Sequence, residues 1–503
     1  MKWINSALGM SLLTILLVSN PANSAPHKTG SSHANAALNF DTDTRLDCNN
    51  LEMFVYNDCN FAYDKDNVLG KTDGLYFPRG TKKTVVYSAG LWIGALVNGE
   101  VRLAIAEYSS EFVPGPMLSG TYQPDNTSFR VYKIATYDTP ESNPDYANWP
   151  TVQGAPVDEN GDPLLIGNQT TWSVCNDANP AAHILDAAAT APLGLEIQQT
   201  SFGFARSGAR GNTYFIKYKL INKGSNHLED AYVSIWADTD LGNAGDDLVG
   251  CDTVLSLGYC YNDGDDTQYG ANPPAVGFDL LQGPIVPSMD DSAFVDGSWR
   301  HGYRNLSMTS FIKYINGTDP ANKVETYGYM RGLVKDPNNG TMVPMINPVT
   351  SSVTSFAVPG DPVANDGWVD QTPADRRLMI NSGPFDMAPG DTQQIVVAVF
   401  VAVGSNPLNS ITALRSSGST IQAMFDHNFT FPTDYNCGDV DQNMQVDITD
   451  VVFLINYVFA GGPAPQDNAD ANVDCSSIVN VTDCVYMINY IFAGGPAPCE
   501  FCP

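Results

Sequence analysis

The sequence predicts a mainly β protein, with one or two β-sandwich domains and a small helical module at the C-terminus. Three observations lead to this prediction. The chain has 503 residues, which is more than one ordinary hydrophobic core accommodates. Short apolar segments, separated by Gly, Pro and Asn turns, recur between residues 40 and 430. Near the end, an acidic stretch is duplicated in tandem, which predicts a separate module over 438–503.

The composition excludes several classes of protein. Hydrophobic residues make up 43% of the chain, which is enough for real cores and excludes global disorder. Lys and Arg number 25 against 55 Asp and Glu, and the resulting net charge of −30 argues against nucleic acid and anionic membranes as partners. The acidic excess instead favours turns and sites for hard cations.

The N-terminal 24 residues have the features of a secretory signal peptide. Lys2 precedes an apolar stretch over 7–18 that is too short to span a bilayer, and Ala22-Asn23-Ser24 offers small residues for cleavage. Residues 25–39 are small and polar and predict a linker. No later apolar run is long enough to span a membrane. We therefore expect a protein that is secreted or held at the cell surface.

All ten cysteines follow the expected cleavage point, and disulfides are the default in an exported protein. Cys175 stands alone in the sequence, and five cysteines crowd the C-terminus, so spacing does not determine the connectivity. The candidate pairs are Cys48 with Cys59, Cys251 with Cys260, and Cys437 with either Cys499 or Cys502.

Two hairpins are predicted inside the β region. Segments 91–97 and 101–107 flank Asn98-Gly99, which is the strongest short signal for a tight β-turn. Segments 213–221 and 231–237 are separated by a short polar stretch and predict a second antiparallel pair.

A strand and a helix are predicted near the end of this region. Residues 394–403 are almost continuously apolar, which is typical of a strand covered on both faces. Residues 410–426 place apolar side chains at helical spacing, and we expect this helix to pack on the sheet. A linker over 431–437 then leads to the module. The apolar helix positions are Ile411, Leu414, Ile421, Met424 and Phe425.

One loop in the middle of the chain is a candidate cation site. Closely spaced carboxylates on a Gly-containing loop after a strand can wrap Ca²⁺, although this spacing is not that of any helix-loop calcium motif. The alternative is an acidic surface loop. The residues concerned are Asp238, Asp240, Asn243, Asp246 and Asp247.

Catalytic signatures are missing from the sequence. It contains no G-x-S-x-G elbow, no H-E-x-x-H and no phosphate-binding glycine loop. Glycoside hydrolysis needs only two suitably spaced carboxylates and stays open. We expect Glu107, Glu111 and Glu196 to be surface residues rather than such a pair. The stretch over 90–100 resembles uncharacterised β-rich secreted bacterial proteins, and this resemblance implies no activity.

The C-terminal repeat is the most informative part of the sequence. The heptapeptide FAGGPAP at 459–465 recurs at 492–498, a shift of 33 residues. The same shift maps Asn456-Tyr457 onto Asn489-Tyr490 and Thr449-Asp450 onto Thr482-Asp483, without a gap. A tandem duplication is the simplest cause.

Each copy opens with a twelve-residue loop whose oxygen-bearing residues fall at EF-hand positions 1, 3, 5, 7, 9 and 12. Position 7 coordinates through its backbone carbonyl, so its side chain is free to vary. The first loop offers four carboxylates and the second two, so we predict that the first binds Ca²⁺ more tightly. The ligands are Asp439, Asp441, Asn443, Gln445, Asp447 and Asp450 in one copy, and Asn472, Asp474, Ser476, Ile478, Asn480 and Asp483 in the other.

A short amphipathic helix is predicted after each loop, over 450–459 and 483–492. Glycine pairs and prolines end both helices. The apolar stripe consists of Val452, Ile455 and Phe459 in one copy and Val485, Ile488 and Phe492 in the other.

Paired loop-plus-helix units of this kind resemble the type I dockerin module, and the resemblance covers 438–498. It implies an EF-hand-like calcium-folded α domain that binds a cohesin domain or a similar extracellular protein. Many dockerins carry Ser-Thr at loop positions 10 and 11, where this chain has Ile448-Thr449 and Val481-Thr482. Position 6, which is normally Gly, is Met444 in one copy and Ser477 in the other. The near-identical copies predict a two-fold face able to dock in either orientation.

These observations predict a secreted, calcium-binding, non-enzymatic protein in which the module docks the β-rich region onto an extracellular partner. Two alternatives remain. The β region could degrade or bind polysaccharide, which a groove lined by several Trp and a carboxylate pair would favour. Alternatively, the chain could self-associate into an extracellular layer or fibre, which its apolar strands would suit.

Overall fold

The computed structural model describes residues 42–206, 208–429, 438–441, 446–465, 468–474, 476, 478–496 and 498. The predicted signal peptide, both linkers, Cys437, Cys499, Asn443 and Gln445 lie outside these residues. Among the helices that are described, none combines the length and the apolar character needed to cross a bilayer.

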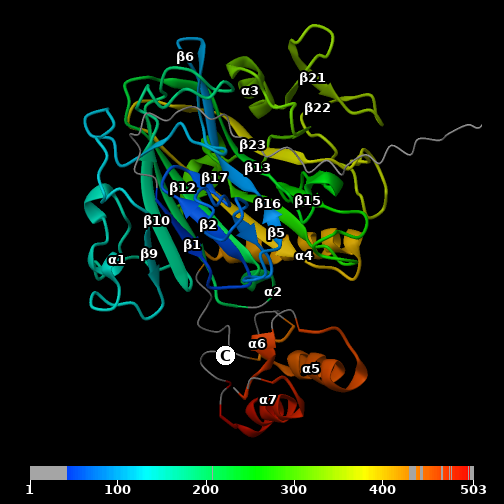
Figure 1. The fold of residues 1–503 in the computed structure, drawn as a ribbon. Coiled ribbons are helices and arrows are strands. Elements are labelled where there is room, and N and C mark those ends of the chain that lie inside the picture. Colours follow the sequence, from blue (N-terminus) through cyan, green and yellow to red (C-terminus); the bar gives the residue numbers. More distant parts are fainter. Residues whose placement is uncertain are drawn as a thin grey trace, which may run out of the picture. The chain divides into compact units, whose positions relative to one another are not determined.

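Two large sheets make up the body of the protein, residues 42–429, and their main ladders are antiparallel (Figure 1). The ten-stranded sheet holds β1 (Asp43–Leu46), β2 (Glu52–Tyr56), β3 (Asn60–Phe61), β4 (Leu75–Tyr76), β5 (Thr84–Val86), β6 (Ser88–Val97), β7 (Glu100–Ile105), β13 (Leu228–Asp238), β19 (Ser310–Ile315) and β23 (Arg376–Met387). The nine-stranded sheet holds β8 (Val113–Pro114), β9 (Tyr132–Ala135), β10 (Gln169–Asn176), β11 (Leu195–Gly203), β12 (Thr213–Asn222), β14 (Leu248–Asp252), β15 (Leu257–Tyr261), β16 (Ala275–Gln282) and β24 (Thr392–Ala402).

One core fills the space between these sheets. Trp92 and Trp236 of the ten-stranded sheet stack with ring centroids 6.1 Å apart, and they share a continuous buried cluster with Ile216 and Val397 of the other sheet. The mainly β prediction is confirmed. The body is a single two-sheet sandwich, because side chains from both sheets interdigitate in this cluster.

The first predicted hairpin is confirmed and the second is wrong. β6 pairs with β7, and Asn98 and Gly99 between them adopt φ of 53° and 80°, as a tight hairpin turn requires. β12 and β13 both form, but β12 pairs with β11 and β24, whereas β13 pairs with β6 and β23. The polar stretch between them therefore carries the chain from one sheet to the other.

α4 (Pro407–Asp426) packs on the outer face of the nine-stranded sheet over β15, β16 and β24, as predicted (Figure 1). On β24, Val397 and Val399 face the inter-sheet core, whereas Ala398 and Phe400 contact the cluster that includes Ile411 and the other predicted helix positions. This alternation explains why the strand is apolar throughout. Asn406 caps the helix by accepting from the backbone of Asn409.

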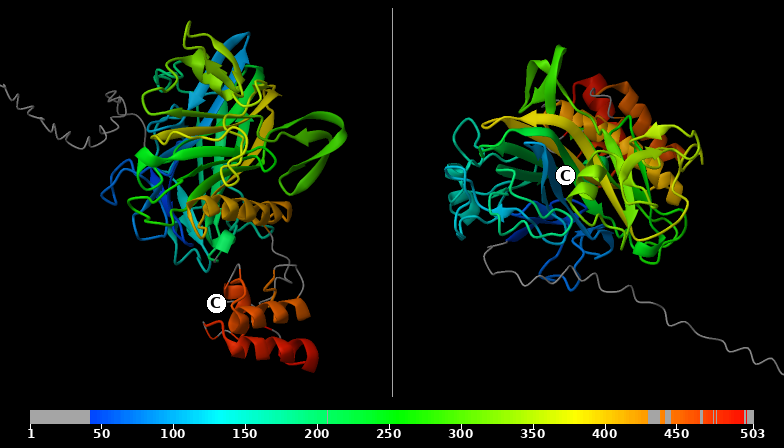
Figure 2. Two further views of the ribbon diagram at one scale, coloured as in Figure 1. Left: turned by 90° about the vertical axis from the view of Figure 1, so that its right-hand side faces the viewer. Right: turned by 90° about the horizontal axis from the view of Figure 1, so that it is seen from above.

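Two small sheets and several short helices lie outside the two large sheets. β17 (Ile285–Val295) and β18 (Ser298–Asn305) form a largely exposed two-stranded arm that projects from the body (Figure 2). A three-stranded sheet contains β20 (Leu333–Lys335), β21 (Met342–Ile346) and β22 (Val353–Thr354). The short helices are α1 (Pro144–Ala147), η1 (Thr151–Gln153), α2 (Gly208–Gly211), η2 (Ala244–Asp246) and α3 (Lys323–Met330).

The C-terminal module contains three helices within its described residues: α5 (Ile448–Ala460), α6 (Asn468–Ala471) and α7 (Val481–Ala493). α5 and α7 begin at equivalent points of the two repeats, and each ends at a glycine with φ near 65°, Gly461 and Gly494. Leu454 and Met487 are fully buried in the module's own small core. The two predicted helices are confirmed, each beginning two residues earlier than predicted.

Candidate metal centre

The first loop of the module gathers carboxylates from both of its ends. One oxygen from each of Asp439, Asp441 and Asp450 lies within 4.8 Å of the other two. Asp450 holds the loop closed, because its Oδ1 accepts from the backbone N–H of Asp441 at 3.0 Å and its Oδ2 from that of Asp447 at 2.9 Å. Asp439 and Asp450 are buried, and Asp441 is half-buried. This arrangement brings together the residues predicted for positions 1, 3 and 12.

The electrostatics of this loop suit a bound cation. Burial, together with the neighbouring charges of Asp441 and Asp439, raises the pKa of the Asp450 carboxyl to about 6. A divalent cation among these oxygens would offset the burial and the mutual repulsion. Asp439, Asp441 and Asp450 are the described residues that would hold a metal ion in this loop.

Asp447, the predicted position-9 ligand, is the N-cap of α5. Its Oδ1 accepts from the backbone N–H of Thr449 at 2.7 Å, and hydrogen bonds to Thr449 lower the pKa of Asp447. A capping box links Asp447 with Asp450. The same two residues therefore begin the helix and close the loop.

The second loop repeats this geometry with fewer charges. Asp483 accepts from the backbone N–H of Asp474 at 3.3 Å and from that of Asn480 at 2.8 Å, and Asn480 caps α7. Asn472 is buried at position 1 and its side chain accepts from the backbone of Ser476 at 3.1 Å. The carbonyl of Ile478 accepts from the side chains of Ser476 and Asn480. The described parts of the second repeat thus have the same loop closure and helix cap, with Asn472 and Asn480 where the first repeat has the carboxylates of Asp439 and Asp447.

The outward faces of α5 and α7 are apolar. Val451 and Leu454 of α5, with Cys484 and Met487 of α7, point into the module core. The predicted apolar stripe lies on the opposite side of each helix and is exposed, with Phe459 at 64% and Phe492 at 62%. The exposed residues are Ile448, Val452, Ile455 and Phe459 on α5, and Val481, Val485, Ile488 and Phe492 on α7; we call these two sets the twin stripes.

In the acidic loop after β13, two of the predicted ligands join a carboxylate cluster. Asp238 and Asp240 lie within 4.8 Å of Asp375, a residue that sequence reasoning missed. Asp246 and Asp247 join no such carboxylate cluster among the described residues; both hydrogen-bond to Asn262. Asn243 caps η2 and accepts from the backbone N–H of Gly245 at 3.3 Å.

A buried arginine pairs with two of the three carboxylates of the Asp238 cluster. Arg377 lies directly across from Asp238 in the β13–β23 ladder and is 2% exposed. Its guanidinium contacts Asp238 at 3.3 Å, Tyr108 at 2.8 Å and also Asp375. Burial opposes this charge, but the surrounding acids and Tyr108 raise the pKa of Arg377. The predicted site did not include Arg376-Arg377, the basic pair that opens β23 and supplies this network.

The prediction that Glu111 and Glu196 are surface residues is wrong, because both are fully buried. Glu196 accepts from the backbone of Met117 at 2.7 Å and pairs with Lys223 at 2.5 Å. Glu111 lies with its Oε2 3.7 Å from Nδ1 of His183, and burial raises its pKa to about 9. Glu107 is half-buried, and burial raises its pKa to about 8. Glu111 and Glu196 therefore make contacts inside the folded body and are not exposed to solvent.

The predicted cysteine pairs are not found in the body. Cys48, Cys59, Cys251 and Cys260 are all free thiols, and Cys59 faces Cys175 across the core rather than Cys48. Cys251 and Cys260 sit in the β14–β15 hairpin opposite Gly258 and Val249, so they are diagonal to each other rather than paired. The cysteine that lies beside Cys59 is therefore Cys175, 116 residues away, and not the nearby Cys48.

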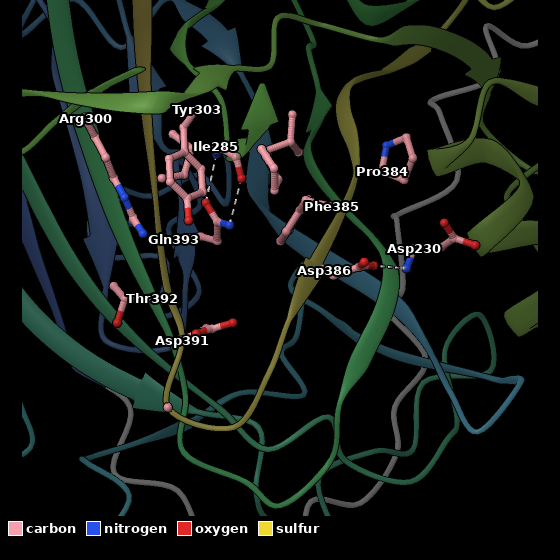
Figure 3. Close-up of a pocket in the computed structure, with 13 residues that line it drawn as sticks. Asp230, Ile285, Arg300, Tyr303, Pro384, Phe385, Asp386, Asp391, Thr392 and Gln393 are labelled. Carbon is pink, nitrogen blue, oxygen red and sulfur yellow. Dashed lines mark hydrogen bonds between the residues drawn. The ribbon is translucent and has the colours of Figure 1, made fainter. Parts of the chain in front are cut away.

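A groove of about 700 Å³ lies between the β17–β18 arm and the β23–β24 turn (Figure 3). Gln393 anchors the arm there, because its side chain accepts from the backbone N–H of Ile285 at 2.9 Å and donates to the carbonyl of Ile285 at 3.0 Å. Arg300 covers the ring of Tyr303 at 4.0 Å. Among the described residues that line it, Tyr303 and Phe385 are the aromatic ones. The tryptophan-lined groove expected of a polysaccharide site is not seen here.

Comparison with known proteins places the chain in no family. No protein-family model and no curated protein sequence matches it. Among solved structures, it is similar to a GH36 alpha-galactosidase variant from Geobacillus stearothermophilus in complex with stachyose, with 10% identity and a TM-score of 0.26. That match covers 73% of this chain and 41% of the galactosidase, so the chain spans less than half of that protein's length. A likeness at this TM-score carries no argument about fold or activity.

Proposed function

We propose that this protein is secreted and that its C-terminal module, folded around Ca²⁺ in a dockerin-like manner, docks the β-sandwich body onto an extracellular protein. The calcium loops set the positions of α5 and α7, because Asp450 and Asp483 are at once predicted ligands, loop closures and members of the capping boxes. Binding the cation and presenting the helices are therefore coupled in this proposal.

The twin stripes carry the proposal. Eight apolar side chains that the module core does not use are exposed on α5 and α7, at positions related by the 33-residue repeat. Apolar surface that is exposed and contiguous marks interaction sites on soluble proteins. The same helices bury their opposite faces in the module core, so the stripes are not needed to hold the helices together.

The apolar character of the twin stripes indicates the kind of surface that a partner would need. Four apolar residues on one helix, with Val and Ile in the middle and Phe at the end, fit a complementary apolar surface on another protein. Because the two stripes match residue for residue in position and apolar character, either one can make the same contacts after a half-turn of the module. A cohesin-like domain or another extracellular protein with a matching apolar patch would serve.

The proposal is tested with the mature full-length chain as bait against the secreted fraction of the source organism. We expect calcium-dependent capture of a partner, loss of capture with a chelator, and loss with a variant that carries Val452→Asp and Val485→Asp together. Capture that persists in the double variant or in chelator would overturn the proposal.

The alternatives make different predictions in simpler experiments. Self-association through the twin stripes would produce calcium-dependent sedimentation of the purified protein without any partner. A glycan-active body would bind or cleave polysaccharide equally well in the double variant, since the stripes lie outside the sandwich.

A further inference from the structure

Two buried cysteines face each other across the core of the body. Cys59 lies in the turn between β2 and β3 of the ten-stranded sheet, and Cys175 lies in β10 of the nine-stranded sheet. They are 116 residues apart in sequence, yet their Sγ atoms are 2.7 Å apart, and both side chains belong to the inter-sheet core. A disulfide requires about 2.05 Å, so roughly 0.7 Å of approach would join them.

The surroundings favour a bond over two separate thiols. Tyr218 of β12 packs beside them in the same core, and the structure holds the sulfurs closer than ordinary non-bonded contact. A covalent bond relieves that crowding.

We infer that Cys59 and Cys175 form a disulfide that joins the two sheets through the core. Both S–H bonds break and one S–S bond forms; the two protons and two electrons pass to an oxidised thiol–disulfide carrier, which is reduced to its dithiol. Because both sulfurs are buried in the native fold, the exchange takes place while the sandwich is still closing. This inference concerns the body and goes beyond the proposed docking function, with which it shares only the expectation of export.

Peptide mapping of the mature wild-type protein, produced by export into an oxidising periplasm, tests the inference. Free thiols are alkylated in denaturant without reductant, and the digest is analysed by mass spectrometry. We expect a Cys59 peptide joined to a Cys175 peptide, which disappears on reduction. Alkylated Cys59 and Cys175, or a Cys59 peptide joined to Cys48, would overturn it.

Matched variants sharpen the result. Cys48→Ser should keep the Cys59–Cys175 peptide at the wild-type yield, because Cys48 takes no part in the bond. Cys175→Ser should leave Cys59 alkylated and should lower the melting temperature by several degrees, since a cross-link closing a loop of this length stabilises the folded chain. If Cys175→Ser does not fold, the wild-type and Cys48→Ser maps still decide the question.

Discussion

Val452 on α5 and Val485 on α7 occupy the same position in the two repeats and are exposed to nearly the same extent, 52% and 51%. On the core-facing side of the same helices, Leu454 of α5 and Met487 of α7 are fully buried. The duplication has therefore kept both an inward face that builds the module and an outward apolar face that does not.

This equivalence predicts how docking responds to substitution. Val452→Asp or Val485→Asp alone should weaken partner binding by no more than about twofold, because the intact stripe still docks after a half-turn. The double variant should weaken it at least about thirtyfold, which corresponds to about 2 kcal/mol. Surface plasmon resonance against the captured partner measures both.

The control for these variants is Val254→Asp, the same substitution at a more exposed valine of the body, which is 91% exposed. It should leave binding unchanged. A single substitution as damaging as the double one would show that only one stripe docks.

The charge difference between the loops predicts unequal calcium sites. The first loop supplies Asp439, Asp441, Asp447 and Asp450, whereas Asp474 and Asp483 are the carboxylates of the second. We expect the first site to bind Ca²⁺ at least about tenfold more tightly, because ligand charge raises affinity. Isothermal titration calorimetry of the mature protein should lose the tight site in Asp450→Ala and the weak site in Asp483→Ala. Equal affinities would contradict the ranking.

Arg377 is predicted to be essential for the stability of the body. Replacing it in Arg377→Met leaves Asp238 and Asp375 buried or half-buried without their guanidinium, which should cost about 3–5 kcal/mol in the free energy of unfolding. Urea unfolding followed by tryptophan fluorescence measures this loss. Arg300→Met, at an exposed position on the β18 arm, should unfold like the wild type. A stable Arg377→Met protein would show that the acids had another counter-ion.

Glu111 predicts a pH dependence of stability. Burial, opposed in part by backbone hydrogen bonds from Leu185 and Ile105, raises its pKa from 4.5 to about 9. Between these two pH values, the folded chain therefore binds more protons than the unfolded chain. The contribution of Glu111 to the free energy of unfolding is complete below the unfolded pKa of 4.5, and it is lost as the pH rises toward 9.

The test compares urea unfolding near pH 5 and near pH 9. Glu111→Gln keeps a neutral hydrogen-bonding side chain and should lose less stability between these two conditions than the wild type. Glu100→Gln, at the exposed β6–β7 turn, should match the wild type. Identical pH slopes for Glu111→Gln and wild type would contradict the assignment.

Sequence reasoning succeeded where the signal is local. Asn98-Gly99 predicted its hairpin because left-handed φ values are needed at adjacent residues, and the continuous apolar run of β24 reflected a strand covered by the core and by α4. The C-terminal helices were predicted in the same way, from loop spacing and caps. Each of these signals can be read from a few consecutive residues of the sequence.

The failures all depend on contacts between distant segments. Nothing near β12 and β13 shows that they belong to different sheets, and Cys175 is brought to Cys59 only when the sheets pack. The burial of Glu111 and the pairing of Asp238 with Arg377 likewise follow from strand order. The twin stripes were predicted as apolar, but their exposure became evident only once the opposite helix faces were seen to fill the module core.

Hydrogen exchange of the mature protein, with and without Ca²⁺ after exhaustive removal of metal, tests the central claim most directly. The account predicts that peptides from α5 and α7 exchange markedly more slowly with Ca²⁺, while peptides from the sandwich core are unchanged. Equal exchange of the α5 and α7 peptides in the two conditions would contradict a calcium-held docking module.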